Sequence, residues 1–133
     1  MSFEISTITS NIKLDTTFNL INIGKYLDLN DNIIGIKYGN DIIRGIYSTS
    51  TNKQKSSFAN QLNIIVLYLG NKVNVSLYQN GTLHFTGCKS INEDISITKY
   101  LISQLNNLNK HIKLEIYTDE FGVMYDNLNY IYS

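Results

Sequence analysis

The sequence has no proline and no tryptophan, only one arginine and only one cysteine. A lone cysteine, Cys88, cannot form a disulfide within the chain, so nothing points to an oxidising compartment. An excess of charge of one sign is missing too, since eleven Lys and Arg residues balance eleven Asp and Glu residues. This balance removes the broad positive field that most nucleic-acid binders use, and it counts against tight, non-specific DNA binding.

Long apolar runs are also absent. No stretch reaches the length of about 18 apolar residues that a transmembrane helix needs. Residues 1–4 lack the basic and apolar regions of a signal peptide. We therefore expect an intracellular protein, in the cytoplasm or a nucleus-like site, without membrane contact. The chain has 133 residues, 43% of them hydrophobic, which predicts one domain whose core needs neither metal nor disulfide.

Residue groups typical of enzymes and metal sites are missing as well. His84 and His111 have no companion Cys, His or Asp at a metal-ligand spacing. Cys88, near the end of a predicted strand, is more typical of a small buried hydrophobic residue than of a nucleophile. The carboxylate pairs at 93–94 and 119–120 fit a helix start and a turn, and no glycine spacing matches a phosphate-binding loop. We expect no enzymatic activity, no metal and no cofactor.

What the sequence has in abundance is isoleucine (20), asparagine (18) and tyrosine (10). These residues have A/T-rich codons, whereas the scarce arginine and proline do not need them. The composition therefore indicates an A+T-rich genome, which bears on origin and not on mechanism.

The first third of the chain predicts a strand, a helix and a hairpin. Residues 3–14 alternate apolar and small polar side chains with one break in phase between Ile5 and Ile8, which a β-bulge would explain. Residues 15–17 offer N-cap oxygens for a short helix over about 18–28. Two β-rich pieces, 33–38 and 42–47, follow on either side of a turn-forming triplet and read as a hairpin.

The middle of the chain predicts a loop and a strand. Residues 48–57 are polar and have no periodicity, so we expect a surface loop there. Residues 62–69 are almost wholly apolar and β-branched, which is typical of a strand in the middle of a sheet, covered on both sides.

The turn at residues 79–81 joins two strands whose apolar faces fix its length. A two-residue loop would place Leu77 opposite His84 and mix apolar with polar side chains on one face. A three-residue loop with Gly81 in the left-handed conformation places Leu77 opposite Leu83 instead. We therefore predict a hairpin with a bulge at Gly81.

A capping box at residues 90–93 opens a helix predicted over about 92–108, whose apolar stripe is a natural cover for the sheet. A last strand is predicted over 111–118. The fold class is α+β: a strongly curved antiparallel sheet with two helices on one face. The other face is left open, and it carries Asn74, Ser76, Tyr78, His84 and Thr86.

Residues 74–90 (NVSLYQNGTLHFTGCKS), followed by an amphipathic helix, resemble the hairpin of a TATA-binding-protein repeat. The ending Thr86-Gly87-Cys88-Lys89-Ser90 is the most specific part. Residues 6–11 are similar to the first strand of such a repeat, and Phe58 resembles its phenylalanine position. The order of elements matches over about residues 3–108, and the signatures at 58–61, 73–75 and 80–81 resemble TATA-binding-protein-like domains of large DNA viruses.

This resemblance implies a half-saddle fold and a transcription factor. In the family, the concave sheet face lies on a widened minor groove and two phenylalanines per repeat wedge between base steps. The resemblance therefore implies wedges at Phe58 and Tyr78 and groove-floor contacts at Asn11 and Thr86. Asn74, Ser76 and His84 would complete that surface, and Lys89 would meet phosphate, as would Lys53, Lys55 and Lys72.

The implied function is binding to the minor groove of A+T-rich promoter DNA or recruitment of transcription machinery. The alternative is a protein-interaction adaptor that keeps the fold without binding DNA. A viral member of the family would act in the host cytoplasm (the viral factory) or in the nucleus, or be packaged in the virion.

Three departures from the family pattern matter. Tyr78 replaces a phenylalanine, and residues 33–57 have no counterpart in a repeat. One repeat, with its core at about 3–108 and a C-terminal strand and tail at 109–133, supplies half of a saddle. The resemblance therefore implies a homodimer, or pairing with a second TATA-binding-protein-like repeat.

Overall fold

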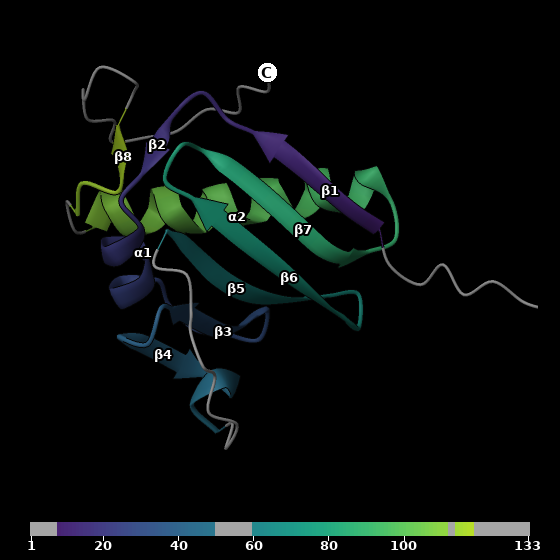
Figure 1. The fold of residues 1–133 in the computed structure, drawn as a ribbon, viewed down its shortest axis with the longest axis horizontal. Helices are drawn as coiled ribbons and strands as arrows, with labels where there is room; N and C mark the ends of the chain where they lie inside the picture. Colours follow the sequence, from purple (N-terminus) through teal and green to yellow (C-terminus); the bar gives the residue numbers. More distant parts are fainter. Residues whose placement is uncertain (1–7, 50–59, 112–113, 119–133) are drawn as a thin grey trace, which may run out of the picture.

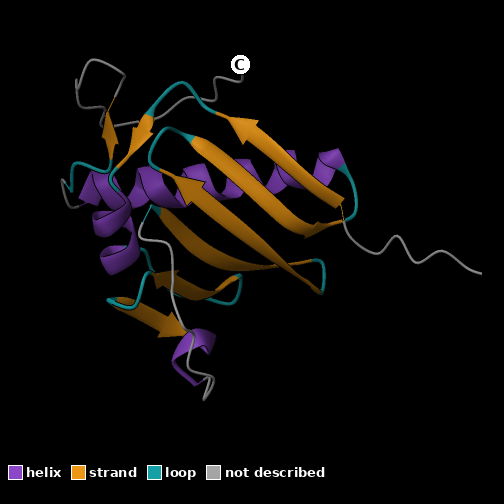
Figure 2. Ribbon diagram, in the orientation of Figure 1, coloured by secondary structure: helices purple, strands orange, loops and turns teal. Residues whose placement is uncertain are grey.

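A curved antiparallel sheet organises the computed structural model, which describes residues 8–49, 60–111 and 114–118 (Figures 1 and 2). Within these residues, six strands lie side by side in the order β1-β7-β6-β5-β3-β4. Their bounds are β1 Ile8–Lys13, β3 Ile33–Tyr38, β4 Ile42–Gly45, β5 Gln61–Tyr68, β6 Asn71–Tyr78 and β7 Thr82–Cys88. The first strand in sequence, β1, thus pairs with β7, the last strand of the main sheet in sequence. Strands β5 and β6 lie in the interior of the sheet.

Two helices cover one face of this sheet. The long helix α2 (Ile91–His111) lies behind β7 and β1 in the view of Figure 1. The short helix α1 (Leu20–Tyr26) packs closely on the same face, since a Cβ built on Gly24 would lie 3.1 Å from Leu62 and 3.2 Å from Ile42. The sheet contributes to the core the inward side chains Ile33, Ile36, Leu62, Ile64, Val66, Val73, Val75, Leu77, Leu83 and Phe85, and α2 contributes Ile97, Leu101, Ile102 and Leu105.

The predicted α+β class, with two helices on one face of a curved antiparallel sheet, is confirmed. The half-saddle arrangement expected from the resemblance is present in the described residues. Neither helix in the described ranges is at once long enough and apolar enough to cross a lipid bilayer.

The hairpin of β6 and β7 has the predicted register. Leu77 lies opposite Leu83 and Val75 opposite Phe85. Gly81 has a φ of +94°, and its backbone N–H donates to the carbonyl of Tyr78 over 3.0 Å. The bulged three-residue turn predicted from the two apolar faces is therefore confirmed.

Both helices are capped by polar side chains, one as predicted and one differently. The Glu93 N–H donates to the Ser90 hydroxyl (3.3 Å), and the Glu93 carboxylate accepts from the Lys89 N–H (2.9 Å), so the cap of α2 is confirmed. For α1, the cap is Asn19, whose Oδ1 accepts from the N–H of Asn22 over 3.1 Å. The predicted cap at residues 15–17 is wrong because Thr17 and the residue after it are held in a strand.

That strand, β2 (Thr17–Phe18), pairs with β8 (Tyr117–Thr118) in a small second sheet. The Thr16 hydroxyl donates to the carbonyl of Thr118 over 2.6 Å, which adds a hydrogen bond beside the β2–β8 pairing. The predicted strand over 111–118 is therefore wrong in extent: α2 continues through residue 111, and within the described residues 114–118 the last two alone form a strand. Tyr117 is fully buried, and its hydroxyl donates to Asn106 of α2 over 2.6 Å.

The hairpin of β3 and β4 is confirmed, but its second strand ends early. Gly45 has a φ of +68°, and a Cβ there would lie 2.2 Å from the carbonyl oxygen of Ile34. The chain turns at this glycine into a 3-10 helix, η1 (Ile46–Thr49), instead of continuing as strand to residue 47.

The predicted central strand lies inside the sheet as β5, but only one of its faces is fully buried. Leu62, Ile64 and Val66 are buried, whereas Ile65 and Leu67 are half-buried on the open face. The expected cover on both sides is therefore wrong. The bulge predicted between residues 5 and 8 and most of the loop 48–57 lie outside the described residues, although β1 shows a register shift between Ile8 and Thr9.

Candidate functional site

One row of polar side chains crosses the face of the sheet that the helices leave open. Cross-strand pairing places these residues side by side through five strands, from β1 to β3. We call them the polar row: Asn11, His84, Ser76, Asn63 and Lys37. Antiparallel partners on one face have Cβ atoms about 5 Å apart, so neighbours in such a row can hydrogen-bond directly.

Two hydrogen bonds link members of the polar row. The Oδ1 atom of Asn11 lies 2.6 Å from Nδ1 of His84. With Oδ1 as the acceptor, this bond requires the form of His84 that carries a proton on Nδ1. Farther along, the Ser76 hydroxyl donates to Oδ1 of Asn63 over 2.7 Å. A second donor, Nε2 of Gln61, reaches the same oxygen over 3.2 Å.

A second row runs parallel to the first and includes Thr86 of β7 and Asn74 of β6, which lie opposite each other. Thr86 is exposed. Asn74 is half-buried, and its Oδ1 is inaccessible to solvent with no hydrogen-bond partner among the described residues. The next residue along this row, Ile65, adds an apolar patch beside the amide.

The charges on the open face are of one sign. Alternation along the strands places Lys13, Lys37 and Lys72 on this face, and no carboxylate lies on it among the described residues. Lys13 Nζ also donates to the carbonyl of Asn80 over 2.6 Å, which holds that ammonium beside the β6–β7 turn. A chain of zero formal charge therefore has one cationic face.

Most of the predicted binding residues come together here. The strand register places Asn11, Asn74, Ser76, Tyr78, His84 and Thr86 on the open face. Tyr78 is half-buried and lies next to Gln61 across the strand pair, whereas Ser76 is buried, with 4% of its surface exposed. Lys89 is apart from them: it is exposed at the junction between β7 and α2. Phe58, Lys53 and Lys55 lie outside the described residues.

Sequence reasoning missed four residues of this face: Lys13, Lys37, Gln61 and Asn63. Reading residues 62–69 as covered on both sides hid the polar alternation at the start of β5, where Gln61 and Asn63 share the open face. The strand register is needed to place Lys13 and Lys37 on this face. The net charge of the whole chain does not reveal them, because acidic residues elsewhere balance their charge.

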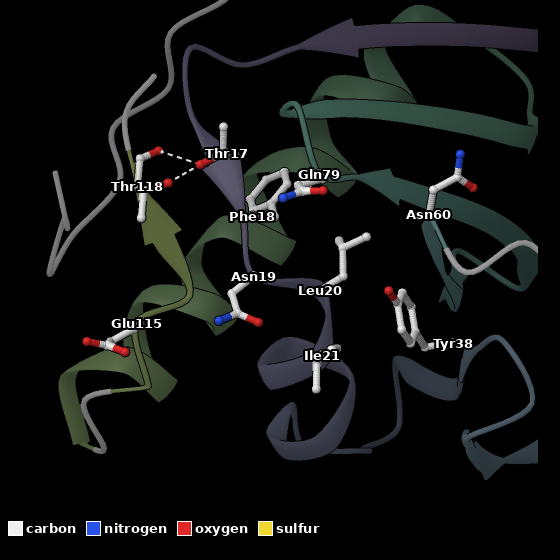
Figure 3. Close-up of a pocket in the computed structure, with 10 residues that line it drawn as sticks. All are labelled: Thr17, Phe18, Asn19, Leu20, Ile21, Tyr38, Asn60, Gln79, Glu115 and Thr118. Atoms are coloured by element: carbon white, nitrogen blue, oxygen red, sulfur yellow. Dashed lines mark hydrogen bonds between the residues drawn. The ribbon is translucent and has the colours of Figure 1, made fainter. Parts of the chain in front are cut away.

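A separate cavity of about 590 Å³ lies where β2, β8, α1 and the ends of β3, β5 and β6 meet (Figure 3). Phe18, Leu20 and Ile21 give it apolar walls, while Asn60 and Gln79 add amides. Among the described residues that line this cavity, Glu115 is the one that carries a charge, and its negative charge makes the cavity unsuited to a phosphate or another anion.

Cys88 is not a reactive group. It is fully buried, and burial together with the neighbouring Asp94 carboxylate raises the pKa of its thiol. A thiol held in the neutral form is a poor nucleophile. Within the described ranges, no group of three or more His, Cys, Asp or Glu side chains is placed to hold a metal ion.

The chain is similar to one viral protein over almost its whole length. It is 32% identical over 139 aligned residues to a protein of Acanthamoeba polyphaga mimivirus named "TATA-box-binding protein-like". The alignment covers 92% of this chain and 38% of the mimivirus protein, so the chain spans less than half the length of that relative. No family model matches the chain, and no solved structure matches it.

Proposed function

We propose that this chain is a TATA-binding-protein-like repeat that acts in transcription initiation by binding the minor groove of A+T-rich duplex DNA. The observation that carries the proposal is the open face itself. It is curved, lined by a row of hydrogen-bonding side chains, and bears three lysines without a carboxylate among the described residues. The similarity to the mimivirus protein supports the same family.

The chemistry of the face suits this ligand. The floor of the minor groove at A·T pairs offers the acceptors N3 and O2, which amide and hydroxyl donors can meet. The phosphates on both sides attract Lys13, Lys37 and Lys72. Tyr78, half-buried at the end of β6, supplies an aromatic ring where a wedge between base steps is expected.

The outer edge of β1 is the place where a second repeat would join. In the described part of the chain, β1 pairs with β7 on one side and has no partner strand on the other. A strand added there would continue the sheet and double the polar row, which has Asn11 at that end. The partner is a second copy of this chain or another TATA-binding-protein-like repeat, and transcription machinery would be recruited to the assembly.

The alternative function is a protein-interaction adaptor of the same fold that does not bind DNA. The observation in its favour is the 590 Å³ cavity, whose apolar walls and amides suit a peptide segment better than a nucleic acid. We propose no catalytic activity and no cofactor for either function.

The test is binding of a fluorescent A+T-rich duplex to the wild-type protein at several salt concentrations. We expect log K to fall with log salt by about 0.9 for each phosphate that a lysine neutralises. Tyr78→Ala should reduce DNA bending, measured by energy transfer between labelled duplex ends. Tyr26→Ala is the matched control, because Tyr26 is 46% exposed on α1, on the helix-covered side.

An affinity that is absent at all salt concentrations would overturn DNA binding and favour the adaptor. Sedimentation of the purified chain with and without duplex would show whether two copies assemble on one site. Equal loss of bending in Tyr78→Ala and Tyr26→Ala would remove the wedge from the proposal.

A further inference from the structure

A second cavity, of about 400 Å³, lies on the helix-covered side of the sheet, where α1, β4 and the C-terminal part of α2 meet (Figure 1). The described residues that line it include two cations, Lys25 and Arg44, one carboxylate, and apolar or aromatic side chains from both helices. Arg44 belongs to the segment 33–57, for which the TATA-binding-protein pattern has no counterpart. The cavity is therefore built partly by residues outside that pattern, away from the open face.

The guanidinium of Arg44, the one arginine of the chain, is held in place by α1. Arg44 lies opposite Ile36 across the β3–β4 pair, and Ile36 is fully buried in the core, so Arg44 is on the covered side of its edge strand. Its Nη1 donates to the backbone carbonyl of Gly24 over 2.8 Å. In the part of the chain that the structure describes, this is its one hydrogen bond, and no carboxylate forms an ion pair with it. Most donors of its planar fork are therefore unused by the described fold.

The charge around this guanidinium is positive on balance. Lys25, in the last turn of α1, is exposed and lines the same cavity. Asp28 is exposed there too, and within residues 8–49, 60–111 and 114–118 neither Lys25 nor Asp28 forms an ion pair. Two cations and one carboxylate leave one net positive charge, which favours an anionic ligand over a cationic one.

Apolar surface lies beside these charges. Tyr26, which is 46% exposed, lines the cavity together with Leu27 and Leu108. Leu108 is half-buried on α2, so part of its side chain can contact a ligand. Inorganic phosphate or a nucleic-acid backbone would leave these walls unused. A peptide that carries a carboxylate next to an apolar side chain would use both the walls and the cations.

We infer that this cavity is a docking site for an acidic peptide segment of a partner protein. A carboxylate of the segment pairs with the fork of Arg44 and is attracted by Lys25. A neighbouring side chain of the size of leucine or phenylalanine packs on Tyr26 and Leu108. The site goes beyond the proposed DNA binding, because it lies on the covered side of the sheet and needs no duplex.

The probe is a short fluorescein-labelled synthetic peptide in which Asp and Glu alternate with Leu and Phe. The wild-type protein without DNA should bind it, as measured by fluorescence anisotropy. Two matched peptides should bind about fivefold or more weakly. One has Asn and Gln in place of the acidic residues, and the other has Ser in place of Leu and Phe.

Exposed charges of the lining can be changed without touching the core. Lys25→Gln should weaken peptide binding about twofold to fivefold, as expected for an exposed ion pair, whereas Asp28→Asn should strengthen it by removing a like charge. Lys110→Gln is the matched control, because Lys110 is an exposed lysine of α2 outside the described lining. Arg44→Lys keeps the charge but loses the fork, so it should weaken binding more than Lys25→Gln does. Circular dichroism shows whether each variant is folded.

Several outcomes would overturn the docking site. Equal affinity for the acidic and the neutral peptide would do so, as would binding that is unchanged in Lys25→Gln and Asp28→Asn. Equal affinity for the serine-containing peptide would show that the apolar walls take no part and that any anion suffices. Self-association of the chain in sedimentation that Lys25→Gln abolishes would make the occupant a second copy.

A parallel titration with duplex DNA separates this site from the open face. Lys25→Gln and Arg44→Lys should bind the duplex as the wild-type protein does. If both lose duplex affinity by the factor by which they lose peptide affinity, the cavity belongs to a nucleic-acid surface and the peptide site is overturned. Peptide binding without any duplex binding would support the docking site and overturn the proposed function alone.

Discussion

The hydroxyl of Ser10 donates a hydrogen bond to Oδ2 of Asp94, across a sequence separation of 84 residues. The bond joins β1, an edge strand, to the first turn of α2 on the covered face of the sheet. Asp94 is only 1% exposed, and its backbone carbonyl accepts from the hydroxyl of Thr98 over 2.8 Å. The carboxylate therefore fixes the N-terminal end of the long helix against the strand that begins the polar row.

Removing this bond should destabilise the fold. Ser10→Ala leaves a buried carboxylate oxygen without its donor, and we expect the free energy of unfolding to fall by about 1–3 kcal/mol. The measurement is urea denaturation followed by circular dichroism. Ser103→Ala is the control, because the Ser103 hydroxyl is exposed on α2 and donates only to the Tyr100 carbonyl. Similar losses of unfolding free energy in both variants would show that the Ser10 bond stabilises the fold no more than an exposed hydrogen bond does.

Gly81, in the turn of the β6–β7 hairpin, should tolerate a side chain poorly. Its φ is +94°, and a Cβ there would lie 2.3 Å from the carbonyl oxygen of Thr16 and 2.5 Å from that of Leu14. Because both obstacles are backbone atoms, Gly81→Ala must displace the chain after β1, and we expect a loss of about 3 kcal/mol or more.

Gly70→Ala gives the comparison. Gly70 also has a positive φ, +82°, but no atom lies within 4 Å of its would-be Cβ. The cost there is conformational strain alone, about 1–2 kcal/mol. Thermal unfolding of both variants measures the difference, and equal costs would mean that the contact with residues 14 and 16 is not rigid.

The sheet and the β6–β7 register were predictable because they follow from alternation of apolar residues over short distances. Leu77 had to meet Leu83 once each strand kept one apolar face. The same alternation located Asn74, Ser76 and His84 on the open face. The stretch at residues 3–14, by contrast, gave the strand but not its described bounds, because the end at Lys13 depends on a partner far away in the sequence.

Features fixed by distant partners could not be predicted. Thr17 was read as a helix cap, but it pairs with Thr118, about a hundred residues later, and Asn19 takes over the cap. Asn63 lies in an otherwise apolar run of the sequence, and the hydroxyl that donates to it belongs to Ser76 on the neighbouring strand. Local patterns predict elements, whereas the donors that orient an amide are visible only in the folded sheet.

The β5–β6 turn should be improvable by one substitution. Leu69 is 80% exposed and has a φ of +50°, in a two-residue turn that also contains Gly70. Leucine is strained in this conformation, whereas Asn-Gly is the favoured pair for such a turn. Leu69→Asn should therefore raise the free energy of unfolding by about 0.5–1 kcal/mol.

The control is Leu29→Asn, because Leu29 is also exposed (38%) but is not at a positive φ. Chemical denaturation of the two variants separates turn strain from a general effect of replacing an exposed leucine. Stabilisation of both by the same amount, or of neither, would contradict the strain argument.

Cys88 should make stability depend on pH in the alkaline range. Its thiol is fully buried, and its pKa is raised by burial first and by Asp94 second. In the unfolded chain the pKa of a cysteine thiol is about 8.5. Burial of the neutral thiol therefore contributes its full share to the free energy of unfolding below that pH, and this contribution declines as the pH rises above it. Between about pH 8.5 and 10, the free energy of unfolding of the wild-type protein should thus fall more steeply than that of Cys88→Ala. In a second measurement, native Cys88 should react with iodoacetamide only as fast as the chain opens. Parallel pH curves for the two proteins, or rapid labelling without denaturant, would show that the thiol is not sealed in the core.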